Sequence, residues 1–424
     1  MNIEEFIVYY KTEGQIFRAY NSLSGQINNL GKLPRDIPNF YLPKKNKKYI
    51  ADDESLKKYA EDLYKDKQEL LKKTGFNYFY YTNKKGEKIV GNHSSCIERF
   101  FKMYPTKQKT DGQVFYKMME RITPEEVELF KMTYNGYLQY INKGEHRVYG
   151  YDYKGFYQCI LDNDEFIIPM KAGKYKTIKN FPKDLKFLSF GFIFVKISCD
   201  NEDFKKIFMF SKDNCYTTYS VKFALKYQTK YNVNIEIIQK ENNAYFHNKK
   251  DCIPSKKIFE RWSKNLNQLK KDLPNNGLIK MLSASLWGHL SRKKKFIKTE
   301  DEINELNNNN LIDLDNSKKY KILDYITDEN NNSFYKVLDV EQPYFYNFRL
   351  KSFITSYGRN ITAELAIKMG LENVVRICCD SVCSTKSFNC DEENKINSKY
   401  CIIPETKSTG KFIFNNVNQP LLPC

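Results

Sequence analysis

Two aspartates interrupt apolar stretches that would otherwise be typical of buried strands. Asp152 lies within "YGYDYKGFYQCI", residues 149–160, and Asp380 follows the apolar segment "ENVVRICC". If the two segments were neighbouring strands of one sheet, their carboxylates would form a site for Mg²⁺, which prefers oxygen ligands. Two such ions can activate an attacking oxygen and neutralise a leaving pyrophosphate. Each aspartate alone is more typical of a turn or a surface position, so the prediction depends on the pair.

A third segment, "GLIKMLSASLWGHL" at residues 277–290, predicts a helix with a cation and a large ring on one face. Lys280, Ala284, Trp287 and Gly288 recur at the spacing of a single helical stripe. A lysine there can bind phosphates, and a ring can pack against a base or a sugar. Core packing is the alternative explanation when the stripe is considered by itself.

These three segments, in this order, contain motifs that resemble those of a known family. The first motif, D-x-x-S-L-Y, is matched by Asp152, Gly155, Phe156 and Tyr157, and the second, K-x-x-x-N-S-x-Y-G, by Lys280, Ala284, Ser285, Trp287 and Gly288. The third, Y-x-D-T-D-S, aligns with "RICCDSV", where Asp380 and Ser381 are kept and Cys378 replaces the first acid. The set resembles the palm and fingers of family-B DNA polymerases, particularly the protein-primed branch of phages, linear plasmids, self-synthesising transposons and viruses.

Weaker matches lie in the same order along the chain. The segment "TYNGY", with Tyr134 and Gly136, resembles the Y-x-G-G/A element that contacts the template. The segment "IFERWSKN" resembles the first finger helix, and "FITSYGRNITAELA" resembles the helix that precedes the third motif. The resemblance therefore covers roughly residues 130–415.

The resemblance implies a role for each matched residue. Asp152 and Asp380 would bind two Mg²⁺ ions, or Mn²⁺ as a substitute, together with the backbone carbonyl of Tyr153. Tyr157 would exclude a sugar 2′-hydroxyl, and Lys280 would hold the triphosphate of the incoming dNTP. The remaining matches would border the nucleotide (Ser285, Trp287, Gly288) or contact the DNA primer-template (Tyr134, Gly136, Ser381).

The resemblance also implies that some parts of the family's architecture are missing. Its proofreading exonuclease needs a strand-borne D-x-E, whereas Asp52-x-Glu54 opens a predicted helix, where acids act as caps. We therefore expect no proofreading. No K-x-Y element follows "GKFIF", so we expect the thumb to be missing or truncated. A second polypeptide supplying a thumb, or a terminal protein used for priming, would then be a partner.

The composition favours a polyanionic partner, and nucleic acid is a better fit than an anionic membrane surface, so we expect no membrane partner. The 424 residues carry a formal net charge of +18, with a pI of about 9.1. We see no apolar run long enough to cross a membrane and no signal peptide, and we expect an intracellular location such as the cytoplasm, a viral factory or an organelle. The eleven cysteines contain no C-x-x-C knuckle, which favours scattered reduced thiols over a structural zinc site.

The pattern along the chain predicts an α+β fold, a right-hand polymerase with an antiparallel palm sheet, helical fingers and a mixed N-terminal region. We expect an N-terminal region of unclear role at 1–130, a first palm part at 131–250, finger helices at 251–290, a variable insertion or loop at 291–340 and a second palm part at 341–424. The stretch from "HRVYGYDYKGFYQCIL" to "LKFLSFGFIFVKIS" is predicted to be β-rich. Asn-rich runs within 291–335 indicate an exposed loop.

Three functions remain open from the sequence. The leading one is a DNA-directed DNA polymerase that adds deoxynucleotides to a primer 3′-hydroxyl by two-metal phosphoryl transfer. A catalytically decayed homologue that binds nucleic acid or a partner is the second, because Cys378 and Ala284 depart from the motifs. The third is an unrelated basic nucleic-acid-binding protein, in which Asp152 and Asp380 would lie far apart.

Overall fold

The computed structural model describes residues 7–11, 17–21, 24–30, 39–41, 53–78, 80–82, 88–90, 93–103, 118–133, 136–309, 311–312, 319–327, 333–344, 346–397, 399–417 and 422–423. The chain forms two compact units, each described by itself below. Unit 1 combines residues 1–114 with 261–289, and unit 2 combines residues 115–260 with 290–424.

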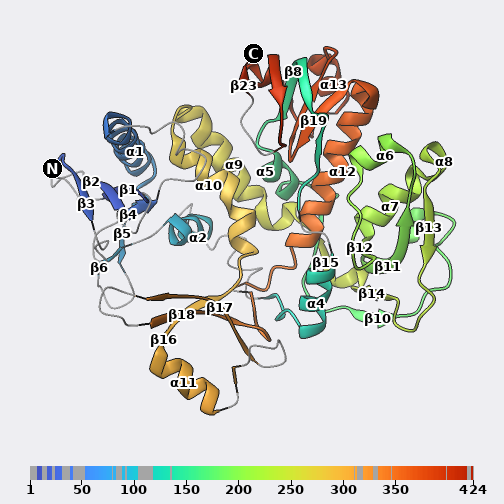
Figure 1. The fold of residues 1–424 in the computed structure, drawn as a ribbon, viewed down its shortest axis with the longest axis horizontal. Helices are drawn as coiled ribbons and strands as arrows, with labels where there is room; N and C mark the ends of the chain where they lie inside the picture. The colour runs from blue at the N-terminus through green and yellow to red at the C-terminus, as the bar shows by residue number, and fades with distance from the viewer. Residues whose placement is uncertain are drawn as a thin grey trace. The chain divides into compact units, whose positions relative to one another are not determined.

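Unit 2 contains a seven-stranded antiparallel sheet in which β8 has a central place (Figure 1). The order along the sheet is β23-β22-β8-β20-β19-β7, and β21 also pairs with β8. The strands are β7 (Gln139–Ile141), β8 (Gly144–Tyr153), β19 (Val374–Cys378), β20 (Ser381–Ser384), β21 (Ile402–Pro404), β22 (Gly410–Phe414) and β23 (Leu422–Pro423). The sheet thus joins segments that are more than two hundred residues apart in the sequence.

The long helix α12 (Lys351–Met369) connects this sheet to a second sheet in the same unit (Figure 1). The second sheet has five strands, all paired antiparallel, with β11 at its centre. Thr217, which precedes α7, donates a hydrogen bond to Ser356 of α12 at 2.7 Å. The elements of this part are β10 (Lys174–Lys176), β11 (Gly191–Ser198), α6 (Glu202–Ile207), β12 (Cys215–Thr217), α7 (Thr218–Lys226), α8 (Gln228–Tyr231), β13 (Asn234–Ile237) and β14 (Ala244–Phe246).

A buried ion pair secures the N-terminal end of α12. Arg349 and Glu126 are both fully buried, and the guanidinium donates to the carboxylate at 2.7 and 2.9 Å. Glu126 also closes the capping box of α4 (Pro124–Met132) with Thr123. The remaining guanidinium N–H groups donate to the carbonyls of Glu120, Arg121 and Met170. Because every buried donor is satisfied, the pair can hold these segments together without an uncompensated charge.

The described residues within 295–339 form strands and a helix, which corrects the prediction of an exposed loop. They form a three-stranded sheet of β16 (Lys295–Thr299), β17 (Tyr320–Thr327) and β18 (Ser333–Asp339), with helix α11 (Glu300–Asn308). Ile303, Ile312 and Val337 make a small core of their own. The Asn-rich composition concealed the strands: Asn304, Asn307 and Asn308 lie in α11, whereas the apolar residues of β16 to β18 carry the fold.

A second correction concerns the segment after Asp152, which was predicted to be β-rich. Residues Phe156–Leu161 form the short helix α5. Gly155 adopts φ 66°, a left-handed conformation that ends β8 and that glycine reaches without strain. A short apolar run cannot be assigned to strand or helix by periodicity alone, which explains the error.

Unit 1 contains the helices that the sequence predicted most clearly. Helix α1 (Asp53–Thr74) buries Leu56, Ala60, Leu63 and Leu70 along one face. Helices α9 (Lys256–Asp272) and α10 (Gly277–Leu290) are separated at "LPNNG", as predicted. Unit 1 takes α9 from Arg261 and α10 as far as His289.

The other elements that the structure describes in unit 1 are helix α2 and two small sheets. Helix α2 covers His93–Met103. The strands are β1 (Ile7–Lys11), β2 (Phe17–Asn21), β3 (Ile27–Leu30), β4 (Asn39–Tyr41), β5 (Tyr80–Thr82) and β6 (Lys88–Val90). Across the described part of the chain, no helix has both the length and the apolar character needed to cross a membrane.

Candidate active site

Asp152 lies on a strand of the seven-stranded sheet, and Asp380 lies in the turn of the hairpin that pairs with that strand. Asp152 is in β8, and Asp380 is in the two-residue turn between β19 and β20. Strand β20 pairs with β8 so that Ser381 stands opposite Asp152. The backbone N–H of Tyr153 donates to the carbonyl of Asp380 at 3.2 Å. Since paired residues on adjacent strands lie about 5 Å apart, the two acids belong to one small region.

The turn that carries Asp380 is fixed from several sides. Cys379 has φ 62°, in the left-handed region that is uncommon for a residue with a side chain. Its carbonyl accepts a hydrogen bond from the hydroxyl of Thr362 at 2.8 Å, and its N–H donates to the carbonyl of Leu138 at 3.1 Å. Burial, and then the charge of Asp380, raises the pKa of the Cys379 thiol to about 12, so this thiol is neutral at physiological pH.

Tyr157 lies beside the same turn. Its hydroxyl is 3.5 Å from the sulfur of Cys379. Burial, followed by the neighbouring Cys379 and the charge of Asp380, raises the pKa of the phenol well above its ordinary value. The ring is therefore a neutral group next to Asp380, and it is presented by α5 rather than by a strand.

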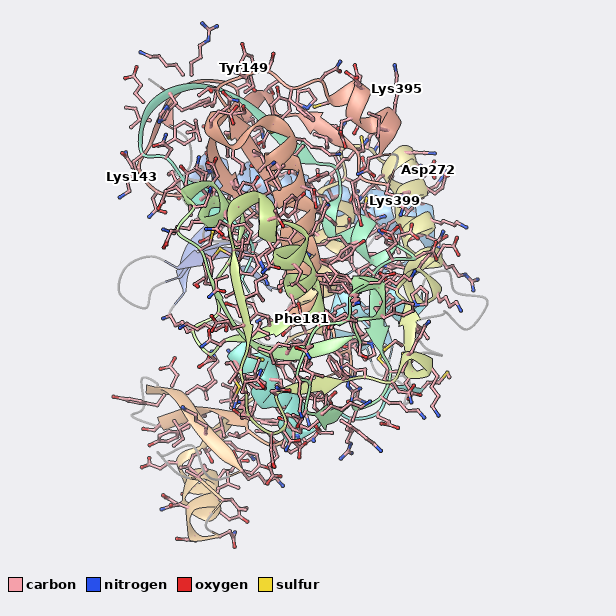
Figure 2. All side chains as sticks on the ribbon, turned by 90° about the vertical axis from the view of Figure 1, so that its right-hand side faces the viewer. Lys143, Tyr149, Phe181, Asp272, Lys395 and Lys399 are labelled. Carbon is pink, nitrogen blue, oxygen red and sulfur yellow. The ribbon has the colours of Figure 1, made fainter. Side chains whose placement is uncertain are left out.

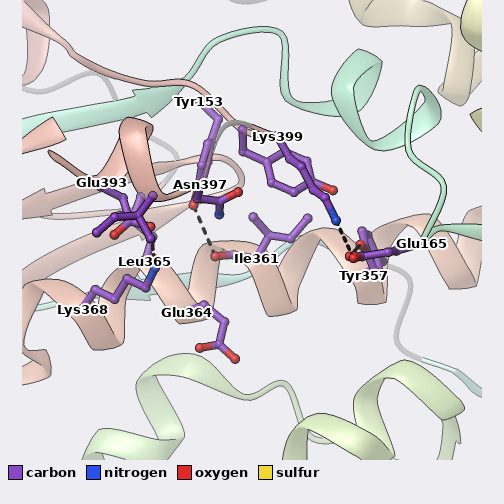
Figure 3. A pocket seen from close by; sticks show the side chains of 12 residues that line it. Tyr153, Glu165, Tyr357, Ile361, Glu364, Leu365, Lys368, Glu393, Asn397 and Lys399 are labelled. Atoms are coloured by element: carbon purple, nitrogen blue, oxygen red, sulfur yellow. Dashed lines mark hydrogen bonds and ion pairs between the residues drawn. The ribbon is translucent and has the colours of Figure 1, made fainter. Parts of the chain in front are cut away.

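Tyr153 points to the other side of the sheet from Asp152, because successive side chains of a strand alternate. Its ring stacks on Phe156, with 5.1 Å between the centroids, and its hydroxyl donates to the carbonyl of Ile361 at 3.4 Å. The ring lines a pocket of about 320 Å³ bordered by α12 and by Lys399 and Glu165 (Figure 3). Any role of Tyr153 on the Asp152 side must therefore involve its backbone.

Of the two residues predicted from the "TYNGY" segment, Tyr134 lies outside the described residues. The carbonyl of Gly136 accepts a hydrogen bond from the guanidinium of Arg359 at 2.6 Å. Arg359 is buried on α12, and its positive charge also lowers the pKa of Tyr157, as the weakest of the effects on that phenol. Helix α12 therefore contacts the Gly136 segment through Arg359 and the Asp380 turn through Thr362.

The face of α10 that is predicted to bind the nucleotide belongs to unit 1. It lies on the side of the helix opposite to its buried leucines. Lys280, Ala284 and Gly288 are exposed, and Ser285 and Trp287 are half-buried. The opposite face is buried and consists of Leu278, Ile279, Leu282, Leu286 and Leu290. The core-packing explanation of the stripe therefore fails for Lys280, Ala284 and Gly288. A Cβ added at Gly288 would meet no described atom within 4 Å, so packing within the chain does not require glycine there.

The start of α10 is capped by the N-terminal helix α1. The carboxylate of Asp66 accepts a hydrogen bond from the backbone N–H of Gly277 at 2.7 Å, and the Asp66 carbonyl accepts one from the side chain of Asn276 at 2.8 Å. Burial raises the pKa of Asp66, the bond from Gly277 opposes this, and the charges of Glu69 and Asp62 add to the increase. Asp66 thus supplies an acceptor that the first turn of α10 lacks.

Further contacts within unit 1 hold the α9 and α10 pair. Lys73 of α1 forms an ion pair with Asp272 at the end of α9, at 2.8 Å. On α2, Phe101 packs edge-on against Trp262, and Glu98 lies 3.7 Å from His289. The helix that carries Lys280 is therefore positioned by residues of the N-terminal region.

The donor atoms at Asp152 and Asp380 fit a hard cation. In the described residues there is no group of three or more His, Cys, Asp or Glu side chains that could hold a metal ion. A metal here would depend on the two carboxylates, a main-chain carbonyl and the substrate. That oxygen-only set is the one on which Mg²⁺ is commonly bound, with one or two carboxylates and substrate phosphates.

Comparison with known proteins identifies the fold. No family model matches the chain, and no curated protein matches its sequence. The structure is similar to Phi29 DNA polymerase complexed with primer-template DNA and incoming nucleotide substrates, with a TM-score of 0.50 and 13% identity over 88% of this chain and 58% of that one. It is also similar to Phi29 DNA polymerase complexed with single-stranded DNA, with a TM-score of 0.50 and 13% identity over 90% and 62%.

The chain has a DNA polymerase-like fold. The predicted fold class, an α+β right-hand polymerase, is therefore confirmed. The chain spans about three fifths of the length of the two solved structures.

The sequence analysis missed three residues that position the candidate groups. These are Arg359, Thr362 and Asp66. Arg359 stands in a helix of otherwise small and apolar buried residues, and a lone buried cation is a detectable signal. Thr362 and Asp66 gave no signal, because their partners are backbone groups of distant segments.

Proposed function

We propose that the chain is a DNA-directed DNA polymerase that extends a primer 3′-hydroxyl with deoxynucleotides. The observation that carries this proposal is the pairing of β8 with β20, which sets Asp152 opposite Ser381 and beside Asp380 in a polymerase-like fold. The solved structures similar to it contain primer-template DNA, nucleotide substrates or single-stranded DNA. The net charge of +18 also favours a nucleic-acid partner.

In this proposal the two carboxylates and the Tyr153 carbonyl would hold two Mg²⁺ ions, or Mn²⁺. Such ions neutralise charge on the reacting phosphates and lower the pKa of a bound hydroxyl. The protein residues orient the reactants. Tyr157 packs under the sugar and leaves no room for a 2′-hydroxyl. Lys280 binds the triphosphate by charge-assisted hydrogen bonds.

The remaining residues of the proposed site contact the base pair or the DNA. Trp287 borders the nascent base pair, and Ser285 and Gly288 allow close approach to the nucleotide. Tyr134, Gly136 and Ser381 contact the template or primer. In the same proposal, the seven-stranded sheet with α12 is the palm, α9 and α10 are the fingers, and the protein acts inside the cell.

A catalytically decayed homologue that binds nucleic acid is the second candidate. The observation in its favour is Cys378, a residue at the end of β19 where the polymerase motif has an acid. A terminal protein used for priming would be a partner of the polymerase.

Primer extension with Mg²⁺ and dNTPs distinguishes the two candidates. We expect extension by the wild-type chain, its loss in Asp380→Asn, and no change in Asp391→Asn, which removes one exposed acid of the same unit. A wild-type chain that binds primer-template but never extends it, with either Mg²⁺ or Mn²⁺, would establish the decayed homologue.

A further inference from the structure

Unit 2 has a strongly basic concave surface that is separate from the aspartate pair. A cavity of about 690 Å³ lies beside β10 and β14 and is lined by five lysines, Lys171, Lys174, Lys176, Lys249 and Lys250. An adjoining cavity of about 360 Å³ shares Lys249 and His247 with it and adds Lys186, Lys222 and Phe187. We call the two cavities together the basic groove. It contains seven lysines and three acids.

The acids of the groove are already engaged. Asp251 lies 3.6 Å from Lys171, Glu120 accepts a hydrogen bond from the backbone of Ala172, and Glu165 pairs with Lys399. Lys174, Lys176 and Lys250 are exposed, and none of them forms an ion pair with a described residue. A concave surface with uncompensated charge of one sign concentrates ligands of the opposite sign. The groove therefore favours a polyanion.

The groove is built on a fixed backbone. A Cβ at Gly173 would come within 2.7 Å of the carbonyl oxygen of Phe246, so the absence of a side chain lets this segment lie directly on β14. His247, which lines both cavities, is buried, and its Nδ1 is 3.1 Å from the carbonyl oxygen of Lys171. Five of the seven lysines, Lys171, Lys174, Lys176, Lys249 and Lys250, thus come from two segments that are held against each other.

One large ring is exposed among these cations. Phe187 is 70% exposed, and the ammonium of Lys186 lies 5.0 Å from the centre of its ring. An exposed aromatic ring beside lysines suits unpaired bases, which stack on rings while their phosphates contact cations. In a duplex the bases are stacked on one another, so the ring would have no such partner. Figure 2 shows this side of the molecule, with Phe181 in the loop that follows β10.

We propose that the basic groove binds single-stranded nucleic acid, with its lysines on the phosphates and Phe187 stacked on a base. The groove and the aspartate pair are attached to the same helix. Phe190 and His247 pack on Phe353 of α12, with ring centres 4.5 and 5.9 Å apart, and Thr362 of α12 holds the Asp380 turn. The separation of nine positions between Phe353 and Thr362 corresponds to about 14 Å along the helix axis.

The test is binding of fluorescein-labelled oligothymidylate of about 20 nucleotides, long enough for one such site, to the full chain at several salt concentrations. Asp380→Asn protein without divalent metal is used throughout, so that binding is measured independently of polymerase activity. The groove variant is Lys174→Gln/Lys176→Gln/Lys250→Gln. The control, Lys143→Gln/Lys196→Gln/Lys395→Gln, removes the same charge from exposed positions of unit 2 that do not line the groove.

We expect the groove variant to bind about ten- to a hundredfold more weakly near 0.1 M salt. The slope of its log binding constant against log salt concentration should be smaller in magnitude by about 2. The control should change both quantities much less. Phe187→Ala should weaken binding about fivefold or more with an unchanged salt slope, because stacking releases no counterions. Equal effects of the groove and control variants would overturn the proposal. Tighter binding of duplex than of oligothymidylate, with the same lysine dependence, would overturn the single-strand assignment.

Discussion

The aspartate pair of unit 2 and the Lys280 face of unit 1 are held in place by different physical means. Asp152 and Asp380 are brought together by the register of β8 and β20, in which Ser381 stands opposite Asp152. The face of α10 is presented by a helix whose first turn is capped by Asp66 of α1. Backbone ladders fix a position through many hydrogen bonds, whereas a cap fixes it through one or two. Substitutions should therefore affect the two regions differently.

The largest expected effect is in the aspartate pair. Asp152→Asn and Asp380→Asn should each lower the rate of primer extension on the order of 10³-fold or more, since charge neutralisation at the phosphates contributes several kcal/mol. Because the two acids would act as one unit, the double variant should be only slightly worse than either single variant. The measurement is single-turnover extension of a labelled primer. Multiplicative losses in the double variant would contradict a shared metal site.

Lys280→Ala tests the other region and should have a smaller effect. Loss of the proposed charge-assisted bond to the triphosphate should lower kcat/KM for dNTPs about ten- to a hundredfold. Lys271→Ala, which removes an exposed lysine from α9, is the matched control. Steady-state kinetics over a range of dNTP concentrations measure both variants. An equal loss in the control would mean that the effect comes from overall charge rather than from the α10 face.

The proposed sugar-checking role of Tyr157 can be tested by changing only the size of the side chain. Tyr157→Val should increase ribonucleotide incorporation relative to deoxynucleotide incorporation by about tenfold or more, because the ring would no longer fill the space of a 2′-hydroxyl. Tyr157→Phe keeps the ring and removes only the hydroxyl near Cys379, so it should retain most of the discrimination. Competition between labelled CTP and dCTP gives the ratio. Unchanged selectivity in the valine variant would exclude Tyr157 as the steric gate.

The smallest effect concerns the cap on α10. Asp66→Ala should destabilise unit 1 by about 1 kcal/mol and accelerate amide exchange near Gly277, because the acceptor is lost. Asp66→Asn keeps an acceptor and removes the repulsion from Glu69 and Asp62. Hydrogen exchange and thermal unfolding measure both variants, with Glu61→Gln as an exposed control.

The raised pKa of Asp66 gives this experiment a pH dependence. A carboxyl whose pKa is higher in the folded state than in the unfolded state binds more protons when folded, so its contribution to stability falls as pH rises through the folded pKa. The wild type should therefore gain stability relative to Asp66→Asn as the pH is lowered from 7 toward the ordinary carboxyl pKa. A constant difference between the two proteins across that range would mean that Asp66 does not titrate abnormally.

The sequence predicted the elements with strong local signals. Helices α1, α9, α10 and α12 have apolar periodicity and clear ends, such as Gly370 with φ 81° after α12. The strand that leads to Asp380 was also expected, because "VVRIC" is a short apolar run before a turn. The errors came where local signals conflict: α5 is too short for its period to be read, and the Asn-rich composition of this part of the sequence concealed β16 to β18.

The sequence by itself predicted which residues could do chemistry, and it determined the kind of element on which several of them lie. It placed Asp152 and Asp380 beside strands and Lys280 on one face of a helix, because those preferences depend on near neighbours in the chain. Only the tertiary structure decided that Ser381 stands opposite Asp152, that Thr362 and Arg359 hold the surrounding turns, and that Asp66 caps α10. These contacts join residues far apart in the chain through backbone groups. Backbone atoms are the same in every residue, so the sequence carries no sign of such a partner until the fold brings the segments together.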